Sequence, residues 1–506
     1  MHKILIRSGG RERMLEAAPG ETLLAVLQRA GVAISAPCGG QGRCGKCRVR
    51  LLRDGESREL LACQSAVEND CILDADALSG GTILAGDSSA PAAGPGLRRG
   101  LGAALDLGTT TAALELFDLE SGESRGCAVD WSALAPYGAD VISRAQYCME
   151  HPDGARLFCE ILRRQTAELL HRLGANSVDL TELFVAGNTV MQHLYVGLDP
   201  SPIARAPFTP PTLFEGPSPE PRLAFAPCVA GYVGGDITAG LLASGLHDQD
   251  GTHLFLDIGT NGEMALGGRD GFLCCAVASG PAFEGAGIAC GMPGLPGAVS
   301  HVRWTEDAPA VEVIGGGEAK GLCGSGLIDL LAVLCEKRIL TGGGLLPGPE
   351  DVPEEYARYV GEDEKGNGIF YLTQDRRVYL TASDVRQLQL AKAAVAAGIR
   401  VLLKRSGLKP GQIASVTLAG GFGSYLDIQS AVGIGMLPAE LSGKARVLGN
   451  TSLSGARMAL LDPKARGRLY DIQRACRYIE LSGDRDFNEE YTEQLVFYEE
   501  DEDEWN

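Results

Sequence analysis

The chain has 506 residues, of which 45% are hydrophobic and 22% charged, and its formal net charge is −20. These values are typical of a globular protein with about three structural units. We find no apolar run of about 18 residues and no basic stripe with interleaved aromatics, so we expect neither membrane insertion nor nucleic-acid binding. The first residues turn polar too soon for a signal peptide, and the 15 cysteines then predict reduced thiols in a cytoplasmic protein.

The first 75 residues predict a small α+β unit. Apolar and polar residues alternate as in strands, and one stretch has the apolar spacing of a helix. A hairpin, a helix, a loop and further strands match a ferredoxin-like β-grasp domain. The expected elements are strands at 3–8, 12–18, 47–52 and near 71–73, and a helix over 21–30.

Four cysteines of this unit point to an iron–sulfur cluster. They follow the spacing Cys-x5-Cys-x2-Cys-x15-Cys, close to the plant-type ferredoxin pattern for a [2Fe–2S] cluster. Glycines between them let backbone N–H groups approach the sulfur atoms. The predicted ligands, which would make this a protein that moves single electrons, are Cys38, Cys44, Cys47 and Cys63.

Other interpretations of these cysteines stay open. A zinc site would more often show two Cys-x2-Cys pairs, and a disulfide framework would need an oxidising compartment. Cys71 is an alternative fourth ligand, but the string Leu60-Leu-Ala-Cys-Gln favours Cys63 because its context is ferredoxin-like.

The rest of the chain predicts an α/β protein built from two lobes. Residues 76–100 are rich in Gly, Ser, Ala and Pro and predict a flexible linker. Strand-like and helical stretches alternate after it, which indicates the α/β class. We expect a first lobe over 101–233, a second over 234–465, and an extension over 466–506 whose acidic run 499–504 forms a solvated tail.

An internal repeat indicates two similar phosphate-binding turns. Leu105-Asp-Leu-Gly-Thr-Thr-Thr111 recurs as Leu256-Asp-Ile-Gly-Thr-Asn-Gly-Glu263. Each copy places an Asp at the end of a buried strand, before a Gly-Thr turn whose N–H groups and hydroxyls can bind phosphate oxygens. The Asp can hold a hydrated Mg²⁺. Two ordinary hairpins are the alternative.

A third loop fits the same ligand. Val416–Tyr425 is an apolar strand that ends in a glycine-rich turn, where a base and ribose can approach closely. The predicted nucleotide-binding residues are Asp106, Gly108, Thr109, Thr110, Thr111, Gly259, Thr260, Asn261, Gly262, Gly420, Gly421 and Gly423.

These loops, with the small-residue segments 185–190 and 448–452, resemble the actin, sugar kinase and Hsp70 superfamily. The resemblance implies ATP bound between two lobes that close on it, and two connecting helices that cross closely. It also makes Asp236 a candidate for orienting the attacking water, together with Asp257 and Glu263. Asp236 fits a helix N-cap equally well.

The pairing of a [2Fe–2S] unit with such an ATPase resembles the reductive activators of corrinoid enzymes. The strings Tyr137-Gly-Ala-Asp-Val-Ile-Ser-Arg144, Asp257-Ile-Gly-Thr-Asn-Gly-Glu263 and Ala419-Gly-Gly-Phe-Gly423 carry this resemblance. It implies ATP-dependent reduction of inactive Co(II) to Co(I) in a corrinoid methyl carrier. It also implies a low-potential electron donor such as a ferredoxin or flavodoxin. The sequence leaves the oligomeric state open, with a homodimer among the alternatives.

Two other functions remain as alternatives. The chain could be an ATP-gated redox sensor, in which the cluster reports redox state and the lobes switch a partner's affinity. It could also be a small-molecule kinase with a regulatory cluster.

Two glycine-rich segments, 278–292 and 322–331, fit either a binding role or simple packing.

Overall fold

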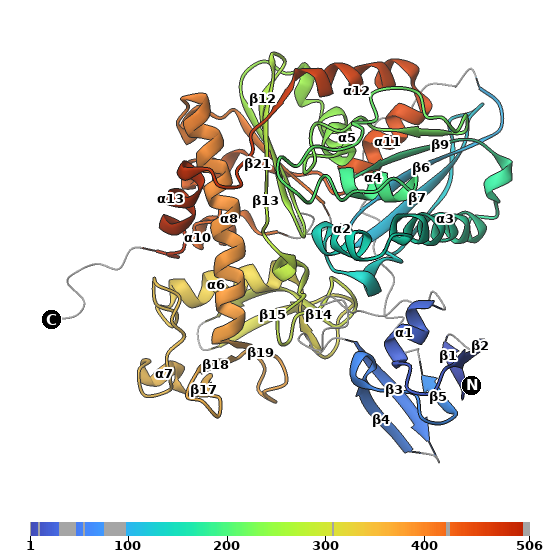
Figure 1. The fold of residues 1–506 in the computed structure, drawn as a ribbon. Helices are drawn as coiled ribbons and strands as arrows, with labels where there is room; N and C mark the ends of the chain where they lie inside the picture. The colour runs from blue at the N-terminus through green and yellow to red at the C-terminus, as the bar shows by residue number, and fades with distance from the viewer. Residues whose placement is uncertain are drawn as a thin grey trace. The chain divides into compact units, whose positions relative to one another are not determined.

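The computed structural model describes residues 2–8, 11–29, 47–53, 56–74, 98–305, 308–420 and 426–498. The acidic run 499–504 and nearly all of the expected linker lie outside these residues. The chain divides into two compact units: residues 1–85, 92–226 and 460–462 form the first, and 86–91, 227–459 and 463–506 the second (Figure 1). Among the helices described, none combines the length and apolar character that a membrane crossing needs.

The N-terminal residues form the β-grasp sheet that the sequence predicts. Its described strands have the order β2-β1-β5-β3-β4, with β1 parallel to β5. Helix α1 buries Leu23, Leu24, Val26 and Leu27, the apolar positions that its spacing indicated. One strand, β4, was not expected. The elements are β1 His2–Ser8, β2 Arg11–Ala17, α1 Leu23–Arg29, β3 Arg48–Arg53, β4 Glu56–Leu61, η1 Ala62–Gln64 and β5 Cys71–Asp74.

The first unit also contains a larger sheet, in the order β10-β9-β6-β7-β8. Strands β6, β7 and β8 are antiparallel, whereas β9 runs parallel to β6 and β10 parallel to β9. Helix α3 packs against β7 and β8. The elements are β6 Leu101–Leu107, β7 Thr111–Asp118, β8 Ser124–Trp131, η2 Ala135–Tyr137, α2 Val141–Glu150, α3 Gly154–Arg172, η3 Ser177–Asp179, β9 Leu180–Gly187, α4 Thr189–Tyr195 and β10 Leu223–Phe225.

The second unit repeats this arrangement. Its main sheet has the order β21-β20-β11-β12-β13-β22, in which β11, β12 and β13 are antiparallel and β20 and β21 are parallel additions. The shared pattern confirms the duplication that the repeated Asp-x-Gly-Thr string predicts. The elements of this sheet and the helices around it are α5 Gly235–Ser244, η4 Leu246–Asp248, β11 His253–Ile258, β12 Gly262–Gly268, β13 Gly271–Val277, η5 Pro281–Glu284, β20 Ser415–Ala419, β21 Ala445–Val447, α11 Thr451–Leu461, α12 Pro463–Ala475 and β22 Cys476–Tyr478.

Two small sheets, β15-β14-β16 and β17-β18-β19, complete the second unit. Helix α8 packs against β12, β13 and β19 and so joins the main sheet to one of them. It begins at a capping box formed by Thr381 and Asp384 and ends at Gly407 in the left-handed region. The remaining elements are β14 Ala298–Trp304, β15 Pro309–Val313, β16 Gly321–Leu322, α6 Gly324–Glu336, α7 Glu354–Ala357, β17 Val360–Glu362, β18 Gly368–Tyr371, β19 Tyr379–Thr381, α8 Ala382–Ser406, η6 Pro410–Gln412, α10 Ile428–Gly433, η7 Ala439–Lys444 and α13 Arg485–Glu493.

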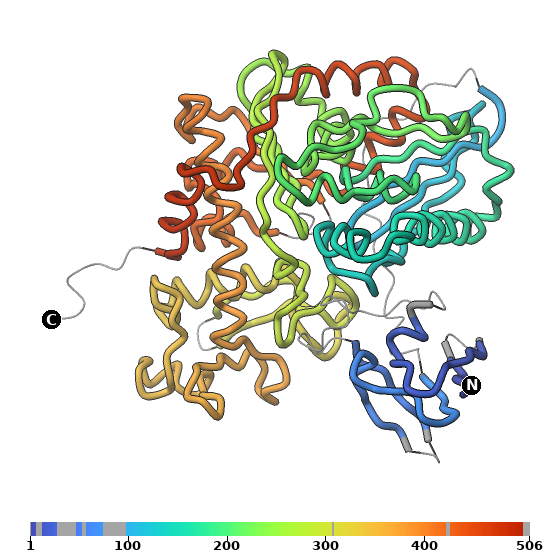
Figure 2. The backbone as a smooth tube through the Cα atoms, viewed as in Figure 1, coloured from blue at the N-terminus to red at the C-terminus, as the bar shows by residue number. Residues whose placement is uncertain are grey.

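The C-terminal segment lies against α8, and Figure 2 shows it as the red tube beside the orange helix. Lys392 of α8 is fully buried, and its ammonium donates to the Val496 carbonyl at 2.6 Å. Burial lowers the pKa of Lys392 to about 8. Gln389 donates to the Leu495 carbonyl at 2.6 Å, and the Phe497 ring lies over the ammonium. Buried side chains of α8 therefore fix the backbone of this segment.

Helices α5 and α11 cross closely in the second unit. A Cβ at Gly455 would lie 2.1 Å from the Ala239 carbonyl oxygen, and one at Gly240 would lie 3.0 Å from the Thr451 hydroxyl. Thr451 belongs to the small-residue segment 448–452, but its helix crosses α5 here, and not the helix at the other predicted segment, 185–190. The absence of a side chain at Gly455 therefore sets the approach of these two helices.

We expect Gly455→Ala to lower the free energy of unfolding by about 1–3 kcal/mol, because the new methyl group meets backbone that cannot rotate away. Gly467→Ala is the matched control: Gly467 is exposed in α12, and a Cβ there would have no atom within 4 Å. That change should raise stability by about 0.4–1 kcal/mol. Urea unfolding followed by circular dichroism measures both, and equal stabilities would contradict the close crossing.

Candidate functional site

Two of the four predicted cluster ligands are described, and the structure brings them together. Strands β3 and β4 pair with Arg48 opposite Leu61, so the residue before β3 lies beside the residues after β4. The Cys63 N–H donates to the Cys47 sulfur at 3.5 Å, and the Ala62 N–H donates to the Cys47 carbonyl at 2.7 Å. Hydrogen bonds from the backbone to cysteine sulfur help to set the reduction potential of an iron–sulfur cluster, so this contact fits a cluster site. Cys38 and Cys44 lie outside the described residues.

Cys71, the alternative fourth ligand, lies elsewhere in the sheet. Its strand β5 pairs with β3 through Leu52 and Ile72, which places Cys71 beside the far end of β3. Six residues of strand correspond to roughly 20 Å between the two ends. Burial and the neighbouring Asp70 also raise the pKa of the Cys71 thiol. This geometry supports Cys63 as the partner of Cys47.

The first Asp-x-Gly-Thr turn joins β6 to β7. Asp106 is 8% exposed, and its neighbours on the two adjacent strands are Ala113 and Ala186. Small residues on both sides leave room around the carboxylate. A Cβ at Gly108 would lie 2.6 Å from the Thr111 carbonyl oxygen, so the tight turn requires glycine there.

The second turn joins β11 to β12 and meets the third predicted loop. Asp257 pairs with Glu263 on β12 and with Ala419 on β20. Gly420 follows directly, with φ +86°, and a Cβ there would lie 2.6 Å from an Asp257 carboxylate oxygen. The structure therefore places Asp257 and Gly420, far apart in the sequence, against each other. Gly421 and Gly423 lie outside the described residues.

A carboxylate that the sequence did not single out lies at this turn. The Thr260 hydroxyl donates to Glu284 at 2.7 Å, and the Ser279 hydroxyl donates to the Gly259 carbonyl at 3.1 Å. Both partners come from segment 278–292, for which the sequence left binding and packing open. The Pro-Ala-Phe-Glu string of Glu284 carries no motif, so only the fold reveals its position.

The three predicted catalytic carboxylates have different surroundings. Glu263 is 6% exposed and lies opposite Asp257. Asp236 lies in the first turn of α5, where a carboxylate is favoured by the helix dipole, and accepts a hydrogen bond from the Ile237 N–H at 2.9 Å. The N-cap interpretation of Asp236 is wrong, because Gly234 occupies that position.

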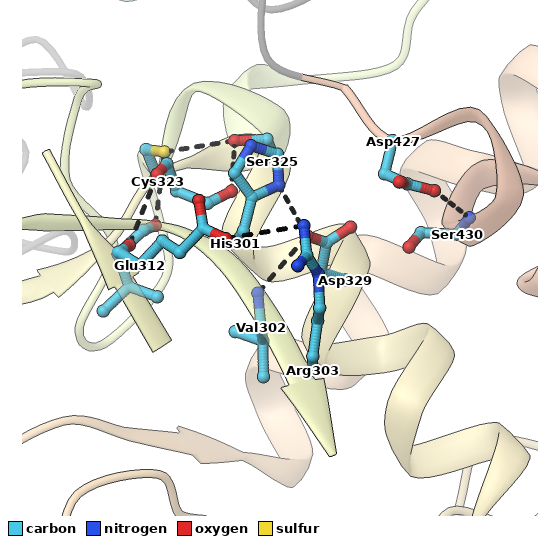
Figure 3. Close-up of polar contacts among 11 residues, drawn as sticks. His301, Val302, Arg303, Glu312, Cys323, Ser325, Asp329, Asp427 and Ser430 are labelled. Carbon is cyan, nitrogen blue, oxygen red and sulfur yellow. Dashed lines mark hydrogen bonds and ion pairs between the residues drawn. The ribbon is translucent and has the colours of Figure 1, made fainter. Parts of the chain in front are cut away.

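The glycine-rich start of α6 packs against β14, which favours the packing interpretation of segment 322–331 (Figure 3). The Ser325 hydroxyl donates to the Ser300 carbonyl at 2.8 Å, and the Cys323 thiol donates to the Val299 carbonyl at 3.3 Å. A Cβ at Gly326 would lie 2.3 Å from that same Val299 oxygen. The glycine thus serves the contact between helix and strand.

A buried carboxylate on α6 strengthens this contact. Asp329 is 3% exposed and accepts hydrogen bonds from His301 Nδ1 at 3.0 Å and from the Val302 N–H at 3.3 Å. Burial raises the pKa of Asp329, and these bonds oppose the rise. Asp329 therefore fastens α6 to β14 through His301 and Val302. Arg303 and Glu312 pair at 3.4 Å between β14 and β15, within the sheet itself.

Family models match three successive parts of the chain. The 2Fe-2S iron–sulfur cluster binding domain covers residues 6–68, the RACo middle region 101–249, and the C-terminal domain of RACo, an ASKHA domain, 251–506. The solved structure of a reductive activator for corrinoid, iron–sulfur protein covers 98% of this chain and 98% of its own, with TM-score 0.71 and 31% identity. The chain belongs to the RACo family of reductive activators. Its fold class is the one that the sequence predicts.

Two curated relatives agree with this membership. The corrinoid activation enzyme RamQ of Eubacterium limosum is 28% identical over 92% of this chain and 94% of its own length. The [Co(II) methylated amine-specific corrinoid protein] reductase of Methanosarcina barkeri is 26% identical over 73% of this chain and 71% of its own.

Because Cys63 lies beside Cys47, we predict that the iron content of the protein depends on Cys63 and not on Cys71. Cys63→Ser should lose most of the bound iron and visible absorbance of the anaerobically purified protein, because a strong thiolate ligand is removed. Cys71→Ser should keep both, since Cys71 lies at the other end of β3. Iron analysis and absorbance spectra compare the two variants, with circular dichroism to show that each is folded. Loss of iron in Cys71→Ser alone would exchange the two assignments.

The position of Glu284 beside Thr260 leads us to predict that its charge contributes to ATP hydrolysis. Glu284→Gln keeps a hydrogen-bond acceptor for Thr260 but removes the negative charge beside the turn. We expect ATP hydrolysis at saturating MgATP to fall about tenfold or more, within the range for lost acid–base or positioning groups, while ATP still binds. Glu318→Gln is the control, because that exposed carboxylate pairs with Arg377 at 2.7 Å. Phosphate release measures both, and an unchanged rate in Glu284→Gln would rule the role out.

Proposed function

We propose that this chain is an ATP-dependent reductase that returns Co(II) of a corrinoid protein to Co(I), so that methyl transfer can resume. One observation carries the proposal. The likeness to the solved reductive activator extends over 98% of both chains, so it includes the iron–sulfur domain as well as the ATPase. A relative that shared only one of these would not have implied coupled reduction.

The energetics explain why one chain would contain both parts. Plant-type clusters have potentials of about −400 mV, and Co(II) in a corrinoid is harder to reduce. Each ~59 mV uphill costs about tenfold in the equilibrium of a one-electron transfer. ATP can change this only by stabilising one state of the complex more than another. We infer that nucleotide binding changes how the protein holds its corrinoid partner, and that hydrolysis resets the complex.

The cysteines fit the cofactor that this function requires. Cys38, Cys44, Cys47 and Cys63 would hold a [2Fe–2S] cluster, and the N–H of Cys63 directed at the Cys47 sulfur supports the assignment. When bound, the cluster supplies single electrons at low potential. Burial of Cys47, which is 1% exposed, keeps water from that side of the site.

The nucleotide is proposed to bind through the residues of the two Asp-x-Gly-Thr turns and the loop at Gly420. The Asp of either turn, Asp106 or Asp257, would hold a hydrated Mg²⁺, because this ion usually keeps several waters and takes one or two carboxylates. Asp236, Asp257, Glu263 and Glu284 are the candidates for orienting the attacking water. Glu284 joins this set on the strength of its bond to Thr260.

The partner is proposed to be a corrinoid methyl carrier, the class of protein that the names of both curated relatives involve. A low-potential ferredoxin or flavodoxin would supply the electron, and the protein would act as a homodimer. A cytoplasmic location belongs to the proposal, because sustained low-potential reduction needs reducing surroundings.

We expect a Co(II) corrinoid protein, mixed anaerobically with this protein and a low-potential reductant, to develop the Co(I) absorbance band when MgATP is added. Without nucleotide the uphill transfer should stay incomplete. Absorbance spectroscopy with and without MgATP makes the comparison. No Co(I) with several corrinoid proteins, despite an intact cluster and measurable ATP binding, would favour the redox-sensor alternative.

Two variants separate the parts of this activity. Cys38→Ala should abolish reduction and leave ATP binding intact, whereas Asp257→Ala should weaken ATP binding and leave the cluster spectrum intact. Full ATP-driven reduction in either variant would show that its residue has been assigned wrongly.

A further inference from the structure

Arg144 is a fully buried arginine in the first unit. It belongs to the string Tyr137–Arg144, which the sequence marks only as a family resemblance, and it is 1% exposed. Helix α2 begins just before it, at a capping box in which Asp140 accepts from the Ser143 N–H at 2.7 Å. Burying a guanidinium is costly unless its donors are satisfied, so its contacts indicate what it is for.

The contacts of Arg144 lead to the first phosphate-binding turn. Its Nη2 donates to the Thr109 carbonyl at 2.7 Å. Its Nε donates to the Gly138 carbonyl at 3.2 Å, and Nη1 lies 3.0 Å from the Met191 sulfur. One rigid guanidinium therefore joins the turn between β6 and β7 to the segment before α2.

The backbone conformation at Gly138 suits its contact with Arg144 and leaves no room for a side chain. Its φ is +156°, and a Cβ there would lie 2.3 Å from the Ser143 hydroxyl oxygen. Its carbonyl accepts from both Nε and Nη2 of Arg144. The start of α2 thus holds the guanidinium plane in a fixed orientation.

Hydrogen bonds to the Thr109 and Thr110 carbonyls set the direction of the peptide dipoles in the turn. The Thr109 carbonyl points at Arg144, and the Thr110 carbonyl accepts from the Ser132 N–H at 2.8 Å. In a planar trans peptide the C=O and the following N–H point in opposite directions. The positive ends of these two peptide units therefore point away from Arg144 and Ser132, an arrangement that favours an anion on the other side.

We propose that Arg144 is a positioning residue for the nucleotide phosphates at this turn. It fixes the shape of the turn through Thr109 and supplies a permanent positive charge behind it. Its contribution should therefore grow with the number of phosphates on the nucleotide. This inference rests on the proposed function, because it takes ATP as the ligand.

Three variants of the full-length protein test the role. Arg144→Met removes both the charge and the hydrogen bonds, whereas Arg144→Lys keeps the charge but cannot bridge the Thr109 and Gly138 carbonyls. Arg163→Met is the matched control, since Arg163 of α3 pairs with Glu220 and does not contact the turn. Calorimetric titration with MgATP, MgADP and adenosine, without any corrinoid protein, gives the affinities.

We expect Arg144→Met to weaken ATP binding by about tenfold or more, the size of effect that one charge-assisted hydrogen bond can have. ADP should lose less and adenosine less than twofold, with Arg144→Lys intermediate and Arg163→Met unchanged. Equal losses for ATP and adenosine would show a merely structural role and overturn the proposal, as would unchanged ATP binding.

Hydrogen exchange on the unaltered protein decides the matter if the variants do not fold. ATP should slow exchange in a peptide over 139–147 more than adenosine does, because Arg144 connects this segment to the turn. Equal protection by both ligands would overturn the proposal. Failure of the unaltered protein to bind ATP would remove the proposed function as well, whereas ATP binding without dependence on phosphate number removes the role of Arg144 alone.

Discussion

The pairing of each aspartate-bearing strand with a parallel neighbour is the constraint on which both candidate turns depend. In the first unit this register sets Leu107 opposite Gly187, and a Cβ at Gly187 would lie 2.6 Å from the Leu107 carbonyl oxygen. In the second, Asp257 pairs with Ala419, and Gly420 follows at the carboxylate. In the first unit a glycine ends the neighbouring strand because the two backbones come too close for a side chain. In the second unit the glycine follows the strand, and a side chain there would meet the Asp257 carboxylate. At both turns the parallel pairing leaves no room for a side chain at this glycine.

Buried cations that bind carbonyl groups are a second theme of the fold. Arg144 donates to the Thr109 carbonyl, and Lys392 donates to the Val496 carbonyl. Such a bond is strong in a low-dielectric interior but demands accurate geometry, so it selects one arrangement of the loop it holds. The energy of burying the charge is recovered only when the loop is in place. Each cation therefore holds a segment that is distant in sequence in one conformation.

The elements that the sequence predicts individually are those with local signals. Period-2 strands, the apolar face of α1 and the repeated Asp-x-Gly-Thr strings need no knowledge of tertiary contacts. Strand β4 was missed because Glu56–Leu61 begins with charged and polar residues, as suits an exposed strand at the edge of a sheet. That same strand then decides the position of Cys63, which spacing alone could not.

The candidate site is less predictable than the fold. Glu284 and Arg144 reach the turns only through contacts across the tertiary structure, and neither lies in a motif whose chemistry names its role. Asp236 shows the limit of a local argument: two glycines precede it, and the sequence could not tell which residue caps the helix. The assignments of Cys38, Cys44, Gly421 and Gly423 stay predictions, because these residues lie outside the part of the chain that the structure describes.

The packing of residues 495–497 against α8 determines where a fusion can be attached to this protein. The main chain of this segment accepts hydrogen bonds from Gln389 and Lys392, and the Phe497 N–H donates to the Gly342 carbonyl at 2.8 Å. Near the end of the described chain, Phe497 is buried while Val496 stays exposed, so the backbone and the Phe497 ring hold the segment in place. A purification tag or fluorescent fusion belongs after this anchor, with a spacer, whereas trimming the terminus back to α13 would leave a charged amine in an apolar slot without its carbonyl partner.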